Sequence, residues 1–441
     1  MTREVAEDRR ARSIRRVSWG ILSAAACWSF LHVCRLAVDV PVEDDWDYLA
    51  AAENFGWNAL FAVHVQHRIV FTRLLFVLSH RLDGLNFVHL LVAQYAIYLG
   101  LVGAMLWLFR EELRKVPYFP LFFLPFFSDL PQVNLLWAGQ SQFHFMLLFT
   151  VLALRFGFRE RATGGTLCGF VFCLIFSIFS MSPLPAALIL MLWIARQGLL
   201  LRRAPSPERA EILRNTLLAA ASVGAAVGLF FLNYAPNLSG GSPPLKMLPV
   251  FVAGSLARGF ALIQPYNIGS SLLCIAIGVL FLLPAFRLGA ALLRDFRTAL
   301  TENGAALALL LWGILLCVAI PFSRGGVIDD RHLEALLPAI PAAGSLLLGL
   351  PSPAAPDSRR RAALEYLICV LIALSFSFSF RLSSELSAHR TEGAETLRRW
   401  AKTPERTLEI PALYPAEFSA PARRGLRLRL NCFRDSASSR L

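Results

Sequence analysis

Apolar runs of roughly twenty residues recur along almost the whole of this 441-residue chain, and they constrain its fold more than any other feature. A run of this length crosses the hydrocarbon core of a bilayer as a helix, because a helix satisfies its own backbone polar groups there without water. Hydrophobic residues make up 56% of the chain and charged residues 17%. A soluble domain usually has about 25% charged residues. The sequence therefore predicts an all-α polytopic membrane protein.

We expect about eleven transmembrane helices. The apolar segment 246–264 is shorter and carries Arg258, so we interpret it as an interfacial or re-entrant helix. The first run continues through Trp28 and Leu31, which favours an uncleaved signal anchor over a cleaved signal peptide. The expected spans lie at about 17–37, 85–109, 118–133, 137–156, 164–181, 183–201, 213–232, 266–286, 303–321, 332–350 and 362–380.

The distribution of Lys and Arg gives the orientation of these spans. Segments assigned to the cytoplasm contain 23 Lys and Arg residues, and the loops assigned to the outside contain 7. The positive-inside rule predicts such a difference, with a cytoplasmic N-terminus. We therefore expect a basic cytoplasmic segment at 1–16, a transmembrane domain at 17–380 with an outer loop at 38–84, and an outer tail or small domain at 381–441.

The net charge of +13 and the eight cysteines exclude two other classes of protein. Apart from the twelve Lys and Arg residues of the tail, which as a long segment follows the charge rule weakly, most basic residues lie at the cytoplasmic ends of the helices. They therefore do not indicate a nucleic-acid partner. Seven cysteines lie in or beside apolar runs, where Cys behaves as a small hydrophobe, and no metal-binding Cys spacing is present. We expect neither a disulfide framework nor a zinc site.

The stretch VPVEDDWDYL follows the first apolar run and contains Glu43, Asp44, Asp45 and Asp47. Acidic residues have little influence on helix orientation, so orientation alone does not require four of them. One interpretation is a solvated acidic loop. A second is a catalytic carboxylate at the membrane surface, since crowded carboxylates and a nearby Arg shift the pKa of a general base. A third is a divalent-cation site, because such ions prefer oxygen ligands.

The rest of the first outer loop has the pattern of helices that lie at the membrane interface. YLAAAENFGWNALFAV combines small and aromatic residues, and aromatic side chains anchor such helices among the headgroups. HVQHRIVFTRLLFVLSHRL then begins a second amphipathic stretch. His64 and Arg68 within it are four residues apart, so a helix would place them on one face.

Four short motifs share a position at the outer side of the expected spans and cover about a tenth of the chain. EDDWDYL and QHRIVFTRLL are similar to the acidic-Trp and EHR…RLL pattern of certain bacterial membrane enzymes. NLLWAGQSQFHFMLL is similar to an aromatic-Gln motif at the outer end of a later span. SRGGVIDDRH resembles an Arg-containing outer loop before one of the last spans. Together they resemble the GT-C superfamily of integral-membrane glycosyltransferases.

This resemblance implies a GT-C-like fold in the plasma membrane of a bacterium. It implies transfer of a sugar from a polyprenyl-phosphate donor to a lipid, glycan or protein acceptor at the outer face. Asp44 or Asp45 becomes the candidate catalytic base. The chain has Gln66 where relatives often have an acid before the His-Arg pair, which argues against a second carboxylate there.

Further candidates come from polar residues near the outer ends of the spans. Arg324 and Arg331 suit a lipid-linked phosphate, although contact with headgroups or with neighbouring aspartates explains them equally well. Gln140 and His144 are four residues apart and either line a cavity or bond between helices. The full set of candidate substrate-binding residues is Glu43, Asp47, His67, Arg68, Gln140, His144, Lys246, Arg258, Arg324, Arg331 and His332.

Two other functions stay open at this point. A transporter or lipid flippase usually has ionisable groups near the bilayer midplane and interrupted helices in related halves. Here the charges collect at the outer boundary and no internal repeat is evident, which favours chemistry at the membrane surface. A non-catalytic partner in envelope assembly is the third interpretation, because a fold does not determine a function.

Overall fold

The structure is a computed structural model that describes residues 3–37, 39, 41, 44–53, 55–128, 131–159, 164–234, 289, 293–294, 296–323 and 330–349. Within these ranges the chain is helical, and the only strand pairing is an isolated bridge between His64 and His67. The elements are α1 (Arg3–Leu36), α2 (Asp45–Glu53), α3 (Trp57–Phe61), α4 (Val70–Asp83), α5 (Phe87–Leu108), α6 (Arg110–Lys115), the 3-10 helix η1 (Phe119–Phe127), α7 (Gln132–Leu135), the 3-10 helix η2 (Ala138–Gln140), α8 (Ser141–Gly157), α9 (Gly164–Ser180), α10 (Leu184–Leu201), α11 (Ser206–Phe231), α14 (Phe296–Glu302), α15 (Gly304–Ser323), α16 (Asp330–Leu333), the 3-10 helix η4 (Glu334–Leu336) and α17 (Ala339–Gly349).

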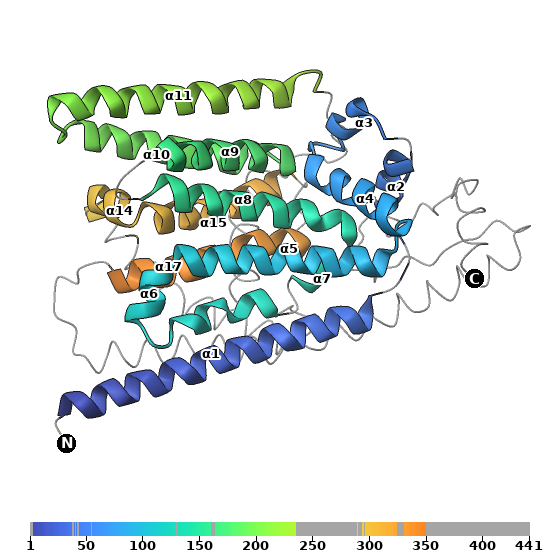
Figure 1. The fold of residues 1–441 in the computed structure, drawn as a ribbon. Helices are drawn as coiled ribbons and strands as arrows, with labels where there is room; N and C mark the ends of the chain where they lie inside the picture. The colour runs from blue at the N-terminus through green and yellow to red at the C-terminus, as the bar shows by residue number, and fades with distance from the viewer. Residues whose placement is uncertain are drawn as a thin grey trace, which may run out of the picture.

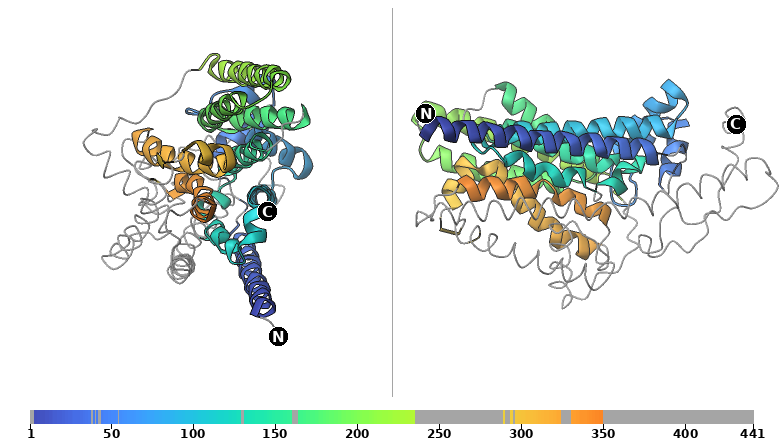
Figure 2. Two further views of the ribbon diagram at one scale, coloured as in Figure 1. Left: turned by 90° about the vertical axis from the view of Figure 1, so that its left-hand side faces the viewer. Right: turned by 90° about the horizontal axis from the view of Figure 1, so that it is seen from below.

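The long helices form a bundle in which their axes run in roughly the same direction (Figures 1 and 2). α8 packs against α5 and α9 in the middle of the bundle, α9 and α10 contact α11, and α15 contacts α10 and α17. α1 lies along one border and contacts η1, whereas α11 lies along the opposite border (Figure 1).

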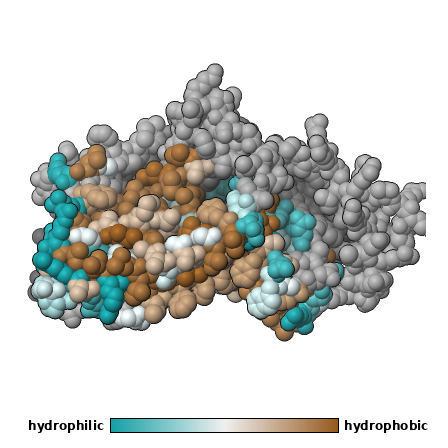
Figure 3. Space-filling model, turned by 90° about the horizontal axis from the view of Figure 1, so that it is seen from above, coloured by the Kyte–Doolittle hydropathy of each residue, from teal (hydrophilic) through white to brown (hydrophobic). Residues whose placement is uncertain are grey.

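The two ends of the bundle differ in the segments that they bring together. The N-terminus of α1 lies at one end with α6 and the connection between α10 and α11 (Figure 1). α2, α3 and α4 lie at the opposite end, next to the ends of α1 and α11. The N-terminal segment, α6 and the connection between α10 and α11, which the charge pattern assigns to the cytoplasm, therefore lie away from the first outer loop. Figure 3 shows a broad apolar surface between hydrophilic ends, as a membrane-embedded bundle requires.

Four described helices are long and apolar enough to cross a membrane, namely Asp8–Leu36, Phe87–Leu108, Leu184–Leu201 and Ser206–Phe231. α14 and α15 add a fifth if this pair, which bends by 111°, counts as one span. The described part of the chain is thus all-α, with several helices that are long and apolar enough to span a membrane. The expected spans at 266–286 and 362–380, the segment 246–264 and the tail 381–441 lie outside the described residues.

Two expected spans are not continuous α-helices. The segment expected at 118–133 contains the nine-residue 3-10 helix η1 and the start of α7. The segment expected at 332–350 is divided among α16, η4 and an α17 of eleven residues. Prolines explain both interruptions, since Pro120, Pro125, Pro338 and Pro341 supply no backbone N–H for an α-helical hydrogen bond.

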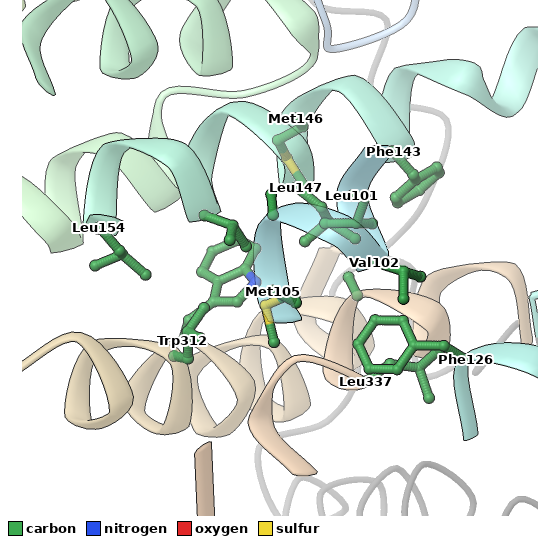
Figure 4. Close-up of a cluster of buried hydrophobic side chains, with 14 of the residues drawn as sticks. Leu101, Val102, Met105, Phe126, Phe143, Met146, Leu147, Leu154, Trp312 and Leu337 are labelled. Atoms are coloured by element: carbon green, nitrogen blue, oxygen red, sulfur yellow. The ribbon is translucent and has the colours of Figure 1, made fainter. Parts of the chain in front are cut away.

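The core of the bundle is a cluster of buried apolar side chains around α5 and α8. Figure 4 labels ten of them, which converge from five parts of the chain. These side chains exclude water from the interior of the bundle, between the end that carries α2 and the opposite end. They are Leu101, Val102 and Met105 of α5, Phe126 of η1, Phe143, Met146, Leu147 and Leu154 of α8, Trp312 of α15 and Leu337 after η4.

Candidate functional site

The segment between α1 and α5, which we call the outer loop after its expected orientation, contains the three helices α2, α3 and α4. The structure thus confirms that this loop contains helices. α2 begins at Asp45 and carries Asp47 in its first turn, where the positive end of the helix dipole stabilises negative charge. α4 buries Phe76 and Val77, and Phe76 packs edge-on against Tyr48 of α2 with ring centroids 5.3 Å apart. Packing of α4 on α2 therefore fixes the acidic stretch against the bundle.

Asp45 is buried and holds α2 to the segment before α8. Its side chain is 1% exposed, and its Oδ1 accepts a hydrogen bond of 2.7 Å from the backbone N–H of Gly139. Gly139 permits this approach because a Cβ there would lie 2.7 Å from Cε2 of Tyr48 and 2.9 Å from Oδ1 of Asp45. A side chain at position 139 would therefore displace Asp45 or Tyr48.

Asp44 has a different environment from its neighbour. Its side chain is 40% exposed, and its Oδ2 lies 3.4 Å from Nε2 of His64. His64 is held by two hydrogen bonds of 2.8 Å that its backbone exchanges with His67. Asp44 therefore presents an accessible carboxylate beside the imidazole of His64, and the backbone of His64 is fixed.

Tyr48 completes this group and was not among the residues expected from the sequence. Its side chain is buried, and its ring lies edge-on to the ring of His64 with centroids 5.0 Å apart. Burial raises the pKa of Tyr48, and the charges of Asp44 and Asp45 raise it further, so the hydroxyl stays protonated at neutral pH. Among the described residues this hydroxyl has no hydrogen-bond partner.

Arg68, a candidate for binding substrate or tuning a carboxylate, ties the outer loop to the end of α11. Its guanidinium group donates to the carbonyl oxygens of Phe230 at 2.7 Å, Phe61 and Leu232. The side chain is buried, so these bonds replace the water that the charge loses. Arg73 acts in the same way inside the loop, where it donates to the carbonyl oxygens of Leu60 and Ala62.

A second polar cluster lies inside the bundle. Nε2 of His144 is 3.0 Å from Oε1 of Glu334, and both side chains are almost completely buried. Asn134 donates from Nδ2 to Oε2 of Glu334 at 2.5 Å. The ring of Tyr98 lies edge-on to the ring of His144, with centroids 5.0 Å apart. The Tyr98 hydroxyl group donates a hydrogen bond to the carbonyl oxygen of Phe126. A carboxylate and an imidazole therefore meet in an environment without exposure to water.

The segment from α7 to η2 connects the two polar groups. Its Asn134 side chain contacts Glu334, and its Gly139 backbone contacts Asp45. Gln94 of α5 fixes the same segment by donating to the carbonyl oxygens of Asn134 at 2.6 Å and Trp137 at 3.2 Å. Any movement of this segment would therefore alter the surroundings of both acidic side chains.

The remaining predicted residues occupy varied positions. His332 is buried against Phe143, with ring centroids 5.8 Å apart. Gln140 is buried and accepts a long hydrogen bond of 3.5 Å from Gln142, whereas Asp47 is exposed. Glu43, Lys246, Arg258 and Arg324 lie outside the described residues, and Arg331 is described only by its backbone in α16. The expected approach of the arginines to the aspartates thus stays a prediction.

Besides Tyr48, sequence reasoning missed Glu334 and Gln94, although a signal for these two exists. Glu334 falls inside the span expected at 332–350, and Gln94 falls inside the one expected at 85–109. A polar residue within a span usually faces the interior of the bundle or a water-filled cavity. This rule, applied to each span in turn, would have selected both residues.

The described side chains provide few groupings that suit a metal ion. Among the residues that the structure describes, no three His, Cys, Asp or Glu side chains are placed so as to hold one together. The two acid–histidine contacts of the site are Asp44 with His64 at the end of the bundle and Glu334 with His144 inside it. Comparison of the chain with protein-family models, with curated proteins and with solved structures finds no match.

Proposed function

We propose that this protein is an integral-membrane glycosyltransferase of the GT-C type. It transfers a sugar from a polyprenyl-phosphate donor to a lipid, glycan or protein acceptor at the outer face of a bacterial plasma membrane. The proposal includes about eleven spans, with the N-terminus in the cytoplasm. The helical bundle with an apolar surface and a helical loop after its first span supports this assignment.

The observation that carries the proposal is the difference between the two adjacent aspartates. Asp45 is buried and bonded to Gly139, so it positions the loop. Asp44 is accessible and lies 3.4 Å from Nε2 of His64. An accessible carboxylate beside a histidine, held at the end of a membrane bundle, suits a general base that acts on a substrate at the lipid–water boundary. We therefore assign the base to Asp44.

The proposed reaction is a single displacement. Asp44 accepts the proton of an acceptor hydroxyl while that oxygen forms a bond to the anomeric carbon of the donor sugar. The bond from this carbon to the phosphate oxygen breaks, and the polyprenyl phosphate leaves with the electron pair. Configuration at the sugar inverts, and Arg324 and Arg331 are the candidates for holding the anionic leaving group.

The test uses the full chain, purified and reconstituted in lipid nanodiscs. The donor probe is a polyprenyl phosphate that carries a radiolabelled hexose, and the acceptor is an extract of native membranes. We expect label in the acceptor fraction with the wild type, and a loss of about a hundredfold or more with Asp44→Asn. The matched control is Glu53→Gln, which neutralises an exposed acid at the far end of α2 and should retain transfer. Full transfer by Asp44→Asn, or none by a folded wild type with a panel of hexoses, would overturn the proposal.

A transporter is the second candidate, because Glu334 and His144 form an ionisable pair inside the bundle. Ionisable groups in such positions mark ion or proton pathways in many transporters. The same labelled lipid in vesicles distinguishes the two functions. An enzyme forms a new glycosidic bond, whereas a transporter moves intact labelled lipid between leaflets.

A further inference from the structure

We infer that Arg155, with Arg110 and Arg159 beside it, binds the phosphate group of an anionic phospholipid at the end of the bundle that carries α6. The inference does not depend on sugar transfer. It concerns the end of the bundle opposite to Asp44, and its ligand is a lipid of the surrounding membrane.

The guanidinium group of Arg155 lies against an aromatic ring at the ends of two helices. Arg155 is in the last turn of α8, and its Cζ is 4.7 Å from the ring centroid of Trp107, in the last turn of α5. α5 and α8 both end beside α6 (Figure 1). Trp side chains favour the headgroup region of a bilayer. We therefore expect the Arg155 charge at the depth of the lipid phosphates.

Two nitrogens of this guanidinium group lack an acceptor. Nε and Nη2 of Arg155 are buried, and neither has a hydrogen-bond partner among the described residues. The dipole of α8 offsets part of the charge at this helix end, but it supplies no acceptor to these nitrogens. A charged donor that is removed from water is costly unless an anion accepts from it. The side chain as a whole is half-buried, so an anion can approach its accessible edge.

The neighbouring charges leave an excess of positive charge around Arg155. Arg110 and Arg159 repel its charge, and Glu111 is the acid that opposes them within the described residues. Oε1 of Glu111 already lies 3.3 Å from Nε of Arg110 and 3.3 Å from Nη1 of Arg114. This carboxylate is therefore shared among several guanidinium groups. The remaining positive charge suits a phosphate, with which a guanidinium group forms paired hydrogen bonds.

The same excess of charge distinguishes between classes of phospholipid. A zwitterionic headgroup such as phosphocholine carries a cation next to its phosphate, and Arg110 and Arg159 would repel that cation. Phosphatidylglycerol has no such cation. Its attraction to the surface increases with each basic residue nearby. We therefore assign the site to an anionic phospholipid.

α5 provides an apolar surface for the acyl chains of this lipid. Val92, Leu99 and Trp107 are exposed, and spacings of seven and eight residues place them on one face of the helix. A Cβ at Gly103, on the same face, would meet no atom within 4 Å, so the surface beside Trp107 is open. Leu99 is about 12 Å along the helix from Trp107, within the roughly 15 Å depth of one leaflet. This surface favours a lipid over a free phosphate ion.

The test measures lipid binding to the purified full chain in detergent by native mass spectrometry. The probes are phosphatidylglycerol, phosphatidylcholine with the same acyl chains, and inorganic phosphate. We expect the wild type to bind phosphatidylglycerol about tenfold or more tightly than phosphatidylcholine, and inorganic phosphate in excess not to displace it. Equal affinity for the two lipids, or displacement by inorganic phosphate, would overturn the inference.

Substitutions then locate the bound lipid. Arg155→Gln should weaken phosphatidylglycerol binding about tenfold, because the phosphate loses its paired hydrogen bonds. Arg203→Gln is the matched control, since it removes one exposed positive charge at the same end of the bundle and should retain binding. Equal weakening by both variants would show a diffuse attraction to the basic end of the bundle and overturn the site.

A second variant keeps the test decisive if Arg155→Gln does not fold. The double variant Arg110→Gln with Arg159→Gln changes two exposed side chains and should also weaken phosphatidylglycerol binding. Glu160 follows Arg159 and lies outside the described residues. If an acid such as Glu160 neutralised Arg155 in place of the lipid, binding would be unchanged in every variant, and the inference would be wrong. Thermal unfolding of each variant establishes that it is folded.

Discussion

Oδ1 of Asp45 accepts a hydrogen bond of 2.7 Å from the backbone N–H of Gly139, although the two residues are 94 positions apart in the chain. The bond joins the first outer loop to the segment before α8. It explains why one of two adjacent aspartates is buried while the other is accessible. Its geometry depends on the absence of a side chain at position 139.

Gly139→Ala should therefore destabilise the protein. The new Cβ would lie 2.7 Å from Cε2 of Tyr48, a ring atom that is held by buried neighbours, and the expected cost is about 1–3 kcal/mol. Thermal unfolding of the detergent-solubilised protein measures this cost. Gly100→Ala in α5 is the control, since a Cβ there meets no atom within 4 Å. Equal stability of the two variants would contradict the close packing around Gly139.

Arg68→Met should loosen the outer loop from the bundle. The substitution keeps an apolar stem but leaves the carbonyl oxygens of Phe61, Phe230 and Leu232 without this donor. Loss of charged hydrogen bonds in a buried setting costs about 2–3 kcal/mol. Hydrogen exchange of the amides in residues 56–62 should become faster, which reports on the loop separately from global stability.

Arg35→Met provides the comparison for Arg68. Arg35 is exposed in the last turn of α1, where a positive charge interacts with the helix dipole by less than about 1 kcal/mol. This variant should leave the exchange of residues 56–62 unchanged. If Arg68→Met also leaves it unchanged, Arg68 does not anchor the loop.

Two of the expected spans match single α-helices closely. The span expected at 85–109 is α5, which begins after the capping side chain of Asn86, and the span expected at 183–201 is α10. The segment expected at 118–133 contains a 3-10 helix and not one continuous α-helix, because hydropathy does not register the backbone N–H groups that prolines lack. Apolar composition thus predicts burial in lipid or protein, but not the type of helix.

The site was predictable only where a single residue type is unusual for its surroundings. The carboxylates of Asp44 and Asp45 are conspicuous beside an apolar run, so sequence reasoning selected both. It could not separate their environments, because the bond from Asp45 to Gly139 depends on the turn between α7 and η2. The contact of His144 with Glu334 likewise joins distant segments that no spacing rule connects.

The orientation of the bundle is testable with cysteine labelling. In a variant without native cysteines, Asn58→Cys and Ser206→Cys each introduce one exposed thiol at opposite ends of the bundle. A membrane-impermeant maleimide should label Asn58→Cys in intact cells and Ser206→Cys only after lysis, because the basic segment around position 206 is expected in the cytoplasm. The reverse pattern would invert the topology, and labelling of both in intact cells would contradict a membrane-spanning α11.

Asp83 should make the stability of the outer loop depend on pH. Partial burial alone would raise the pKa of Asp83, but hydrogen bonds from Asn86, His89 and Ser79 outweigh it and hold the pKa below its ordinary value of 3.8. A group whose pKa is lowered on folding stabilises the fold above its unfolded pKa, and this contribution is lost as the pH falls through the folded pKa. Asp83→Asn should therefore be less stable than the wild type at neutral pH.

The difference should shrink as the pH falls below about 4 and disappear below the lowered pKa of folded Asp83, because the wild-type carboxyl group is then also neutral. Unfolding midpoints of both proteins between neutral and acidic pH measure this convergence. Asp8→Asn is the control, since Asp8 makes an exposed pair with Arg12 and should give a small difference. A constant gap between Asp83→Asn and the wild type would mean that the Asp83 carboxylate is not the origin of the effect.

His64 should affect turnover more than substrate affinity if it positions Asp44. Nε2 of His64 lies 3.4 Å from Oδ2 of Asp44, and the backbone of His64 is fixed by its bridge to His67. His64→Gln should lower kcat about tenfold or more and leave KM for the polyprenyl-phosphate donor nearly unchanged, because the base loses its orientation while the donor contacts remain. The double variant with Asp44→Asn should be no slower than Asp44→Asn alone, since the effects of two residues that act as a unit are not additive.

His89→Gln, a substitution of an exposed histidine, is the control and should retain the wild-type rate. Independent, multiplicative losses in the double variant would show that the two side chains act separately, and Asp44 would then need another partner to serve as the base.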